Sequence, residues 1–196
     1  MNEAMPYAHA EKVLSTLWPT HPDDGTQLYA VLDGARNDGI YPSVVRSECE
    51  FECLYTGELA PDLVRAAPYL VKLERDHAFI DALVRNGWGD SWGIFLRASI
   101  PFKQLRRHLR TFLMVYDPTI KPMYFRYYDP RVLRTFLPTC DKEQLAMMFG
   151  PALCFMLEDE DPDVLLRFSI ASGSLQSQAI RMAEQTYAGS SAGFGR

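Results

Sequence analysis

An abrupt change from a strand pattern to a helix pattern within residues 123–140 constrains the fold of this chain more than any other feature. Four aromatic residues lie between Met123 and Tyr128, a composition typical of a β-strand. Asp129 and Pro130 follow, and this pair favours a helix start, because aspartate accepts bonds from the free amides of the first turn and proline has no amide to leave unpaired. We therefore expect a strand over 123–128 and a helix from about residue 130.

Strand and helix patterns alternate along the rest of the chain. Apolar or alternating runs predict strands at 28–32, 68–73, 92–96, 153–158 and 164–169, and a hairpin that joins 111–117 to 121–129. Apolar positions at helical spacing predict helices at 10–18, 76–87, 102–110 and 141–150, with a helical turn at 62–66. Residues 43–55 fit both patterns, and we favour a helix followed by a strand from about Phe51.

A chain of 196 residues with 47% hydrophobic content is long enough to bury the core of one domain. We predict a single α/β domain over residues 1–170, in which helices flank a mixed β-sheet. From residue 171 the composition shifts to Ser, Gly, Gln and Ala. Within this tail, 171–196, apolar positions from Leu175 to Tyr187 trace a short helix, and we expect the last residues to be flexible.

The formal charge of −5 argues against nucleic acid or an anionic membrane as a partner, because binding to phosphate groups depends on basic surface. No apolar run approaches the length of about 18 residues that a membrane helix needs. The first ten residues also lack the pattern of a secretion signal. We therefore expect a cytoplasmic protein whose four cysteines are free thiols.

Cys49 and Cys53 are spaced like a pair of zinc ligands, but a zinc site needs about four ligands, and no CxxC or HxxxH motif accompanies this pair. Free cysteines are commonly buried as small hydrophobic residues, so we expect no metal site. The sequence also contains neither a GxGxxG motif nor a P-loop, and we expect no cofactor.

His108 and Asp129 are the residues that a small hydrolase could use, and we keep this enzyme as an alternative function. No GxSxG motif or catalytic cysteine signature supports it. Helix capping already explains Asp129, and His108 lies in a basic helical segment where it can interact with the helix dipole. The alternative requires the two side chains to meet within hydrogen-bond reach in a cleft.

The basic helix at 102–110 carries Lys103, Arg106, Arg107 and Arg110, which are spread over its outer side. An RNA-binding protein that uses this helix is a second, less favoured alternative. The acidic overall charge and the lack of any known RNA or DNA module favour a solvated face or an acidic protein partner instead.

Seven residues are candidates for partner binding. Arg131 and Arg134 lie three apart on the helix predicted after Pro130, which would suit a bidentate grip on a carboxylate, although ion pairs within the chain are an equal alternative. The tryptophans are either interface anchors or, with greater weight, part of the core. The full set is Trp88, Trp92, Arg126, Arg131, Arg134, Met182 and Tyr187.

Six motifs in order along residues 28–170 resemble the effector chaperone/adaptor domain of bacterial type VI secretion systems (Tap/Tec type), a former domain of unknown function. The motifs are LYAVLDGAR at 28–36, APYLVKL at 67–73, WGDSWGIFL at 88–96, HLRTFLMV at 108–115, FRYYDPRVLRTFLPTC at 125–140 and FGP at 149–151. The order of all six makes the match specific, although each motif alone is weak.

This resemblance implies an α/β lobe that binds a toxic secreted effector and helps to load it onto the spike protein at the tip of the secretion tube. It implies no catalysis and offers no catalytic residues to carry over. Members commonly have a further helical lobe at the C-terminus, whereas about 26 residues follow Ile170 here. The motif residues are expected to serve folding as much as binding; they include Asp33, Gly34, Arg36, Trp88, Gly93, Arg126, Asp129 and Arg131.

Overall fold

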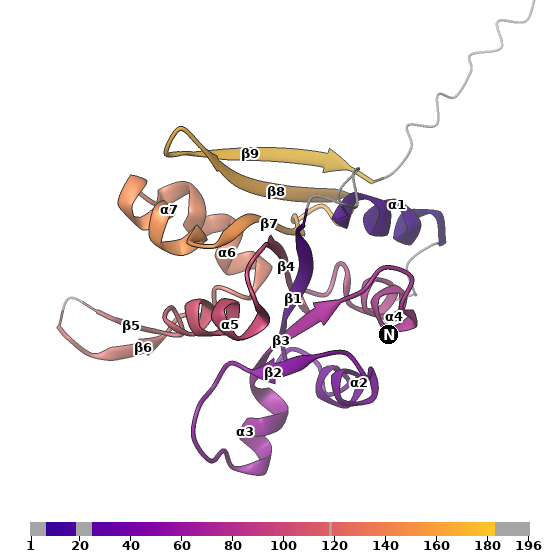
Figure 1. Ribbon diagram of the computed structural model, residues 1–196, viewed down its shortest axis with the longest axis horizontal. Coiled ribbons are helices and arrows are strands. Elements are labelled where there is room, and N and C mark those ends of the chain that lie inside the picture. Colours follow the sequence, from indigo (N-terminus) through magenta and orange to yellow (C-terminus); the bar gives the residue numbers. More distant parts are fainter. Residues whose placement is uncertain (1–6, 19–24, 118, 183–196) are drawn as a thin grey trace, which may run out of the picture.

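The fold is known from a computed structural model, which describes residues 7–18, 25–117 and 119–182. Seven strands form one sheet, and every pair of neighbouring strands in it is antiparallel (Figure 1). In order across the sheet they are β2 (Phe51–Cys53), β3 (Pro68–Leu73), β1 (Gln27–Asp33), β4 (Gly93–Ala98), β7 (Ala152–Glu158), β8 (Val164–Ala171) and β9 (Ser174–Arg181).

Helices cover both faces of this sheet. One face packs against α1 (Tyr7–Leu17), α2 (Ile40–Arg46) and α4 (Ala78–Gly87). The other packs against α5 (Phe102–Arg110), α6 (Pro130–Phe136), the short 3₁₀ helix η1 (Leu137–Thr139) and α7 (Lys142–Phe149). The remaining helix, α3 (Pro61–Ala66), buries no residue, and a hairpin of β5 (Met114–Tyr116) and β6 (Pro122–Tyr124) forms a separate small sheet.

Alternation along the central strands divides the core into two layers, since successive side chains of a strand point to opposite faces. In β1, Tyr29 and Val31 pack toward α5, α6 and α7, whereas Leu28, Ala30 and Leu32 pack toward α1, α2 and α4. Figure 1 shows the two groups of helices on opposite sides of the strands. The prediction of a single α/β domain with a sheet flanked by helices is confirmed.

The sheet was expected to be mixed, but the described pairings are all antiparallel. Continuous apolar runs such as 28–32 are typical of parallel strands, because helices bury both faces of a parallel sheet. Here helices bury both faces of an antiparallel sheet, so the same composition arises without parallel pairing.

The predicted strand at 123–128 is correct only at its start. Strand β6 ends at Tyr124, and the following residues turn into the core beneath α5 and α6. Tyr127 is fully buried, and its hydroxyl donates to the carbonyl of Leu109 at 2.9 Å. Burial in a turn therefore accounts for Tyr127 and Tyr128, while the predicted helix start at Pro130 is confirmed.

The predicted helix from Leu175 to Tyr187 is wrong where the structure describes it. Residues 174–181 form β9, which pairs with the whole of β8 from Ala171↔Ser174 to Val164↔Arg181. The two strands are joined by Ser172 and Gly173, both with positive φ, as a tight hairpin turn requires. The expected flexible end and Tyr187 lie outside the described residues.

None of the described helices combines the length and apolar composition that crossing a membrane requires.

Candidate functional site

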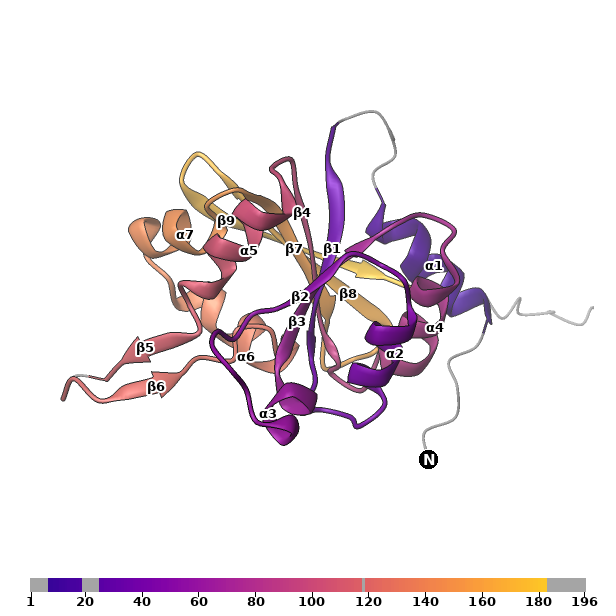
Figure 2. The same ribbon diagram turned by 60° about the horizontal axis from the view of Figure 1, so that its bottom comes forward.

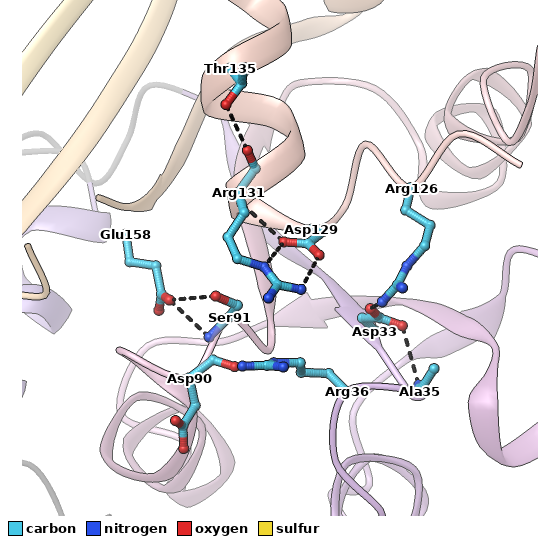
Figure 3. Close-up of polar contacts among 10 residues, drawn as sticks. All are labelled: Asp33, Ala35, Arg36, Asp90, Ser91, Arg126, Asp129, Arg131, Thr135 and Glu158. Atoms are coloured by element: carbon cyan, nitrogen blue, oxygen red, sulfur yellow. Dashed lines mark hydrogen bonds and ion pairs between the residues drawn. The ribbon is translucent and has the colours of Figure 1, made fainter. Parts of the chain in front are cut away.

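Charged side chains from segments far apart in the sequence meet at one end of the sheet (Figure 3). They come from the end of β1 and the turn after it, the loop before β4, the segment that leads into α6 and the first turn of that helix, and the end of β7. We call this group the polar cluster; it consists of the side chains of Asp33, Arg36, Ser91, Arg126, Asp129, Arg131 and Glu158, together with the backbone carbonyl of Asp90.

Asp33 is the most deeply buried acid of the polar cluster, with 1% of its surface exposed. Its carboxylate forms an ion pair with Arg126 and accepts a hydrogen bond from the amide of Ala35 at 3.2 Å. The hydrogen bond to Asp33 raises the pKa of Arg126 above its ordinary value. The side chain of Arg126 is itself 43% exposed, so this arginine contacts both the buried carboxylate and the solvent.

Asp129 has two roles at the start of α6. Its carboxylate caps the helix by accepting from the amide of Arg131 at 3.0 Å, and it also binds the Arg131 side chain through two bonds of 2.9 and 2.6 Å. Burial alone would raise the pKa of Asp129, but the hydrogen bonds from the side chain and amide of Arg131 outweigh it and leave the pKa lowered. The start of α6 is therefore held by a bidentate ion pair as well as by a helix cap.

Glu158 fixes the loop that precedes β4. It is 5% exposed and accepts hydrogen bonds from the amides of Gly89 at 2.6 Å and Ser91 at 2.8 Å, and from the Ser91 hydroxyl at 3.1 Å. Burial raises the pKa of Glu158, and these hydrogen bonds counter only part of that effect. On the other side of the loop, Arg36 donates to the carbonyl of Asp90 at 2.6 Å.

The polar cluster combines acids that are bound within the chain with two arginines that remain partly exposed. Each of its three buried carboxylates is bound by donors of the same chain, and the Ser91 hydroxyl donates to Glu158. Arg126 and Arg131 differ, because 43% and 47% of their side chains remain exposed. An arginine has five N–H donors, so each can still bind a carboxylate of a partner.

The pair that a hydrolase would need is not formed. His108 lies against α7, with its Nε2 3.2 Å from the carbonyl oxygen of Met148, and burial lowers its pKa. Asp129 is bound by Arg131 instead, and within the described residues no hydrogen bond joins it to His108. Nor do the described residues contain a group of three potential metal ligands; the four cysteines are free.

The other candidate residues have contacts within the chain. Arg134 pairs with Glu160 at 3.3 Å and is 15% exposed. Trp88 is buried, and its indole N–H donates to the carbonyl of Pro162 at 2.8 Å, which places it in the core. Trp92 is half-buried against Gly87, where a Cβ would lie 2.7 Å from the indole ring.

Met182, expected on an exposed helical stripe, is instead buried in the core beside α1 and α4. In the basic helix α5, Arg106 is bound within the chain, because it donates to the carbonyl of Cys53 at 2.9 and 2.7 Å. Sequence reasoning missed Glu158, since nothing in its local sequence marks a carboxylate that binds a loop 67 residues away.

Comparison with known proteins gives one match. A family model described as a domain of unknown function (DUF4123) matches residues 28–147, which include most of the polar cluster. This family is known as a type VI secretion effector adaptor (Tap-like) domain and is not a known enzyme family. No curated protein and no solved structure matched the chain.

Proposed function

Because this chain belongs to the DUF4123 family, we propose that it is a non-enzymatic adaptor that binds a secreted type VI effector and helps to load it onto the spike protein. The observation that carries the proposal is the family match over residues 28–147, more than half of the 196-residue chain. The family is linked to effector and spike interactions in general. For this chain, the effector and the spike are the two proposed partners.

The polar cluster supports a binding role. Its buried acids are bound within the chain, whereas Arg126 and Arg131 present partly exposed guanidinium groups. In the proposed complex, these arginines bind acidic groups of a partner and set its orientation, while apolar contacts supply most of the affinity. A specific complex would bury about 1,000 Å² or more of surface.

The contacts of Arg131 decide which substitution can test this role. Reversing its charge would place a second carboxylate beside Asp129, which is 4% exposed, and would destabilise the fold together with any complex. Arg131→Lys keeps the positive charge but loses the bidentate geometry. It should therefore destabilise the fold less than charge reversal, and its free energy of unfolding, measured beside its affinity for the partner, separates partner binding from folding.

Co-purification tests the proposed function. The tagged chain is produced in its own bacterium, and the retained proteins are identified by mass spectrometry. We expect a type VI effector, recognised by its toxicity when produced alone in a target cell, to co-elute with the chain at a fixed ratio when both are purified and mixed. Separate elution of the chain and of every type VI effector of that bacterium would contradict the proposal.

A further inference from the structure

The β5–β6 hairpin projects from the body of the domain (Figures 1 and 2), and apolar side chains on both of its strands are exposed. Residues 114–117 and 119–124, which we call the hairpin arm, hold five of the ten large hydrophobic residues that are exposed in the described part of the chain. Their exposed fractions are 39% for Met114, 66% for Tyr116, 80% for Ile120, 49% for Met123 and 68% for Tyr124. Exposed apolar surface of this density is typical of interaction sites.

The hairpin arm is held in shape by its own hydrogen bonds. Met114 pairs with Tyr124 and Tyr116 with Pro122 across the two strands. In the loop, one oxygen of Asp117 accepts from the amides of Thr119 at 2.8 Å and Lys121 at 2.9 Å. An arm that is already ordered loses little conformational entropy when a partner binds.

The tip of the hairpin arm places an isoleucine where its backbone is strained. Ile120 has a φ of 63°, a left-handed conformation that is unfavourable for β-branched residues by roughly 1–2 kcal/mol. Its side chain is 80% exposed, so packing within the chain does not offset this cost. Glycine or asparagine at this position would make the fold more stable. Isoleucine therefore does not serve folding here, and what it adds is an exposed apolar side chain.

The sequence that contains the arm is basic. Residues 102–134 contain eight of the 20 Lys and Arg of the chain and two of its 25 Asp and Glu, a net charge of +6 where the whole chain has −5. Helix α5 leads directly into the arm and exposes Lys103 and Arg107, and Lys121 is exposed in the arm itself. In the described part of the chain, none of these three has an acidic partner.

Building on the proposed adaptor function, we infer that the hairpin arm and the exposed cations of α5 form the docking surface for the effector. The occupant is an acidic segment of the effector whose apolar side chains cover Tyr116 and Ile120. Its carboxylates meet Lys103, Arg107 and Lys121. Like charges would repel if two copies met through this basic surface, and the net charge of −5 of the whole chain disfavours nucleic acid, so an acidic protein segment is the occupant that fits.

Calorimetric titration of the full chain with the effector identified by co-purification tests this inference. We expect the double variant Tyr116→Ser/Ile120→Ser to raise Kd at least about 30-fold, since central aromatic residues dominate interface energies. Tyr7→Ser is the matched control, because Tyr7 on α1 is 65% exposed and Tyr116 is 66% exposed. It should leave Kd within about twofold of wild type, as expected for a residue outside the interface.

A second pair of variants tests the charge. Arg107→Glu should raise Kd about tenfold, whereas Arg46→Glu, the same change at an exposed arginine of α2, should leave it nearly unchanged. Kd of the wild-type complex should also rise with salt concentration.

Each outcome separates the inference from the proposed function. If the effector binds but the arm variants and Arg107→Glu keep the wild-type Kd, the docking surface is wrong and the adaptor function stands. If Tyr7→Ser or Arg46→Glu weakens binding as much as the arm variants do, the surface is likewise wrong. If the wild-type chain binds no effector, the proposed function fails and the inference fails with it.

Discussion

The ion pair between Arg126 and Asp33 leads to an asymmetric prediction for stability. Asp33 is 1% exposed, and without Arg126 its remaining hydrogen bond recorded in the structure is from the amide of Ala35. Leaving a buried charge without its partner typically costs about 3–5 kcal/mol. Because the Arg126 side chain is 43% exposed, water screens part of the pair, and we expect Arg126→Met to lower the free energy of unfolding by about 3 kcal/mol, the low end of that range.

Replacing the other partner of this ion pair, Asp33, should lower the free energy of unfolding much less. In Asp33→Asn the amide oxygen can still accept from Ala35, and the half-exposed guanidinium of Arg126 is solvated by water. We expect a loss of about 1 kcal/mol, and a similar loss in the double variant, because neither leaves a buried charge unpaired. Urea unfolding followed by tryptophan fluorescence measures all three values. A loss below about 1 kcal/mol for Arg126→Met, or equal losses for the two single variants, would refute this reasoning.

Three further predictions concern single positions. Burial holds the pKa of Glu158 above its ordinary value, so the folded state binds a proton there more tightly than the unfolded state does. Wild type should therefore lose unfolding free energy relative to Glu158→Gln as the pH rises above 4.5, and a change of opposite sign would contradict this. Gly93→Ala should cost at least about 2 kcal/mol in urea unfolding, because its Cβ would lie 2.2 Å from the carbonyl oxygen of Val31; an unchanged midpoint would contradict the packing. Asp141→Ala should cost about 1 kcal/mol by the same assay, because it removes the capping box of α7, and no loss would mean that the cap does not contribute.

Short sequence patterns correctly predicted helix starts and a hairpin, which depend on bonds between residues close in the sequence. Asp129 and Pro130 begin α6 as expected, because a cap and a proline act on the turn that they start. Asp141 and Gln144 form the predicted capping box, and the predicted hairpin between 111–117 and 121–129 is present in its central part.

Features that depend on distant partners were not predicted correctly. Residues 174–181 have helical spacing of apolar side chains, but pairing with the long strand β8 satisfies their backbone across eight residues and determines the structure. The antiparallel sheet order also depends on which distant strands pair, which local patterns do not encode.

In the candidate site, too, local features could be predicted from the sequence and contacts between distant residues could not. The arginines were identified as candidates, yet Arg126 meets an acid 93 residues away in the sequence, which no spacing rule predicts. The pairing of Arg131 with Asp129 could have been expected from their separation of two residues, had Asp129 been considered as more than a cap. The hairpin was predicted, but its exposed apolar surface was not, because aromatic strand patterns normally indicate burial, whereas Tyr116 and Tyr124 are exposed.

Secretion of the effector tests the adaptor function most directly. The gene for this chain is deleted in its own bacterium, and the effector found by co-purification is measured in the culture medium, together with a shed tube component as the control for an intact secretion system. We predict that the effector disappears from the medium while the tube component remains, and that the wild-type gene restores secretion. Unchanged effector secretion in the deletion strain would contradict the adaptor function.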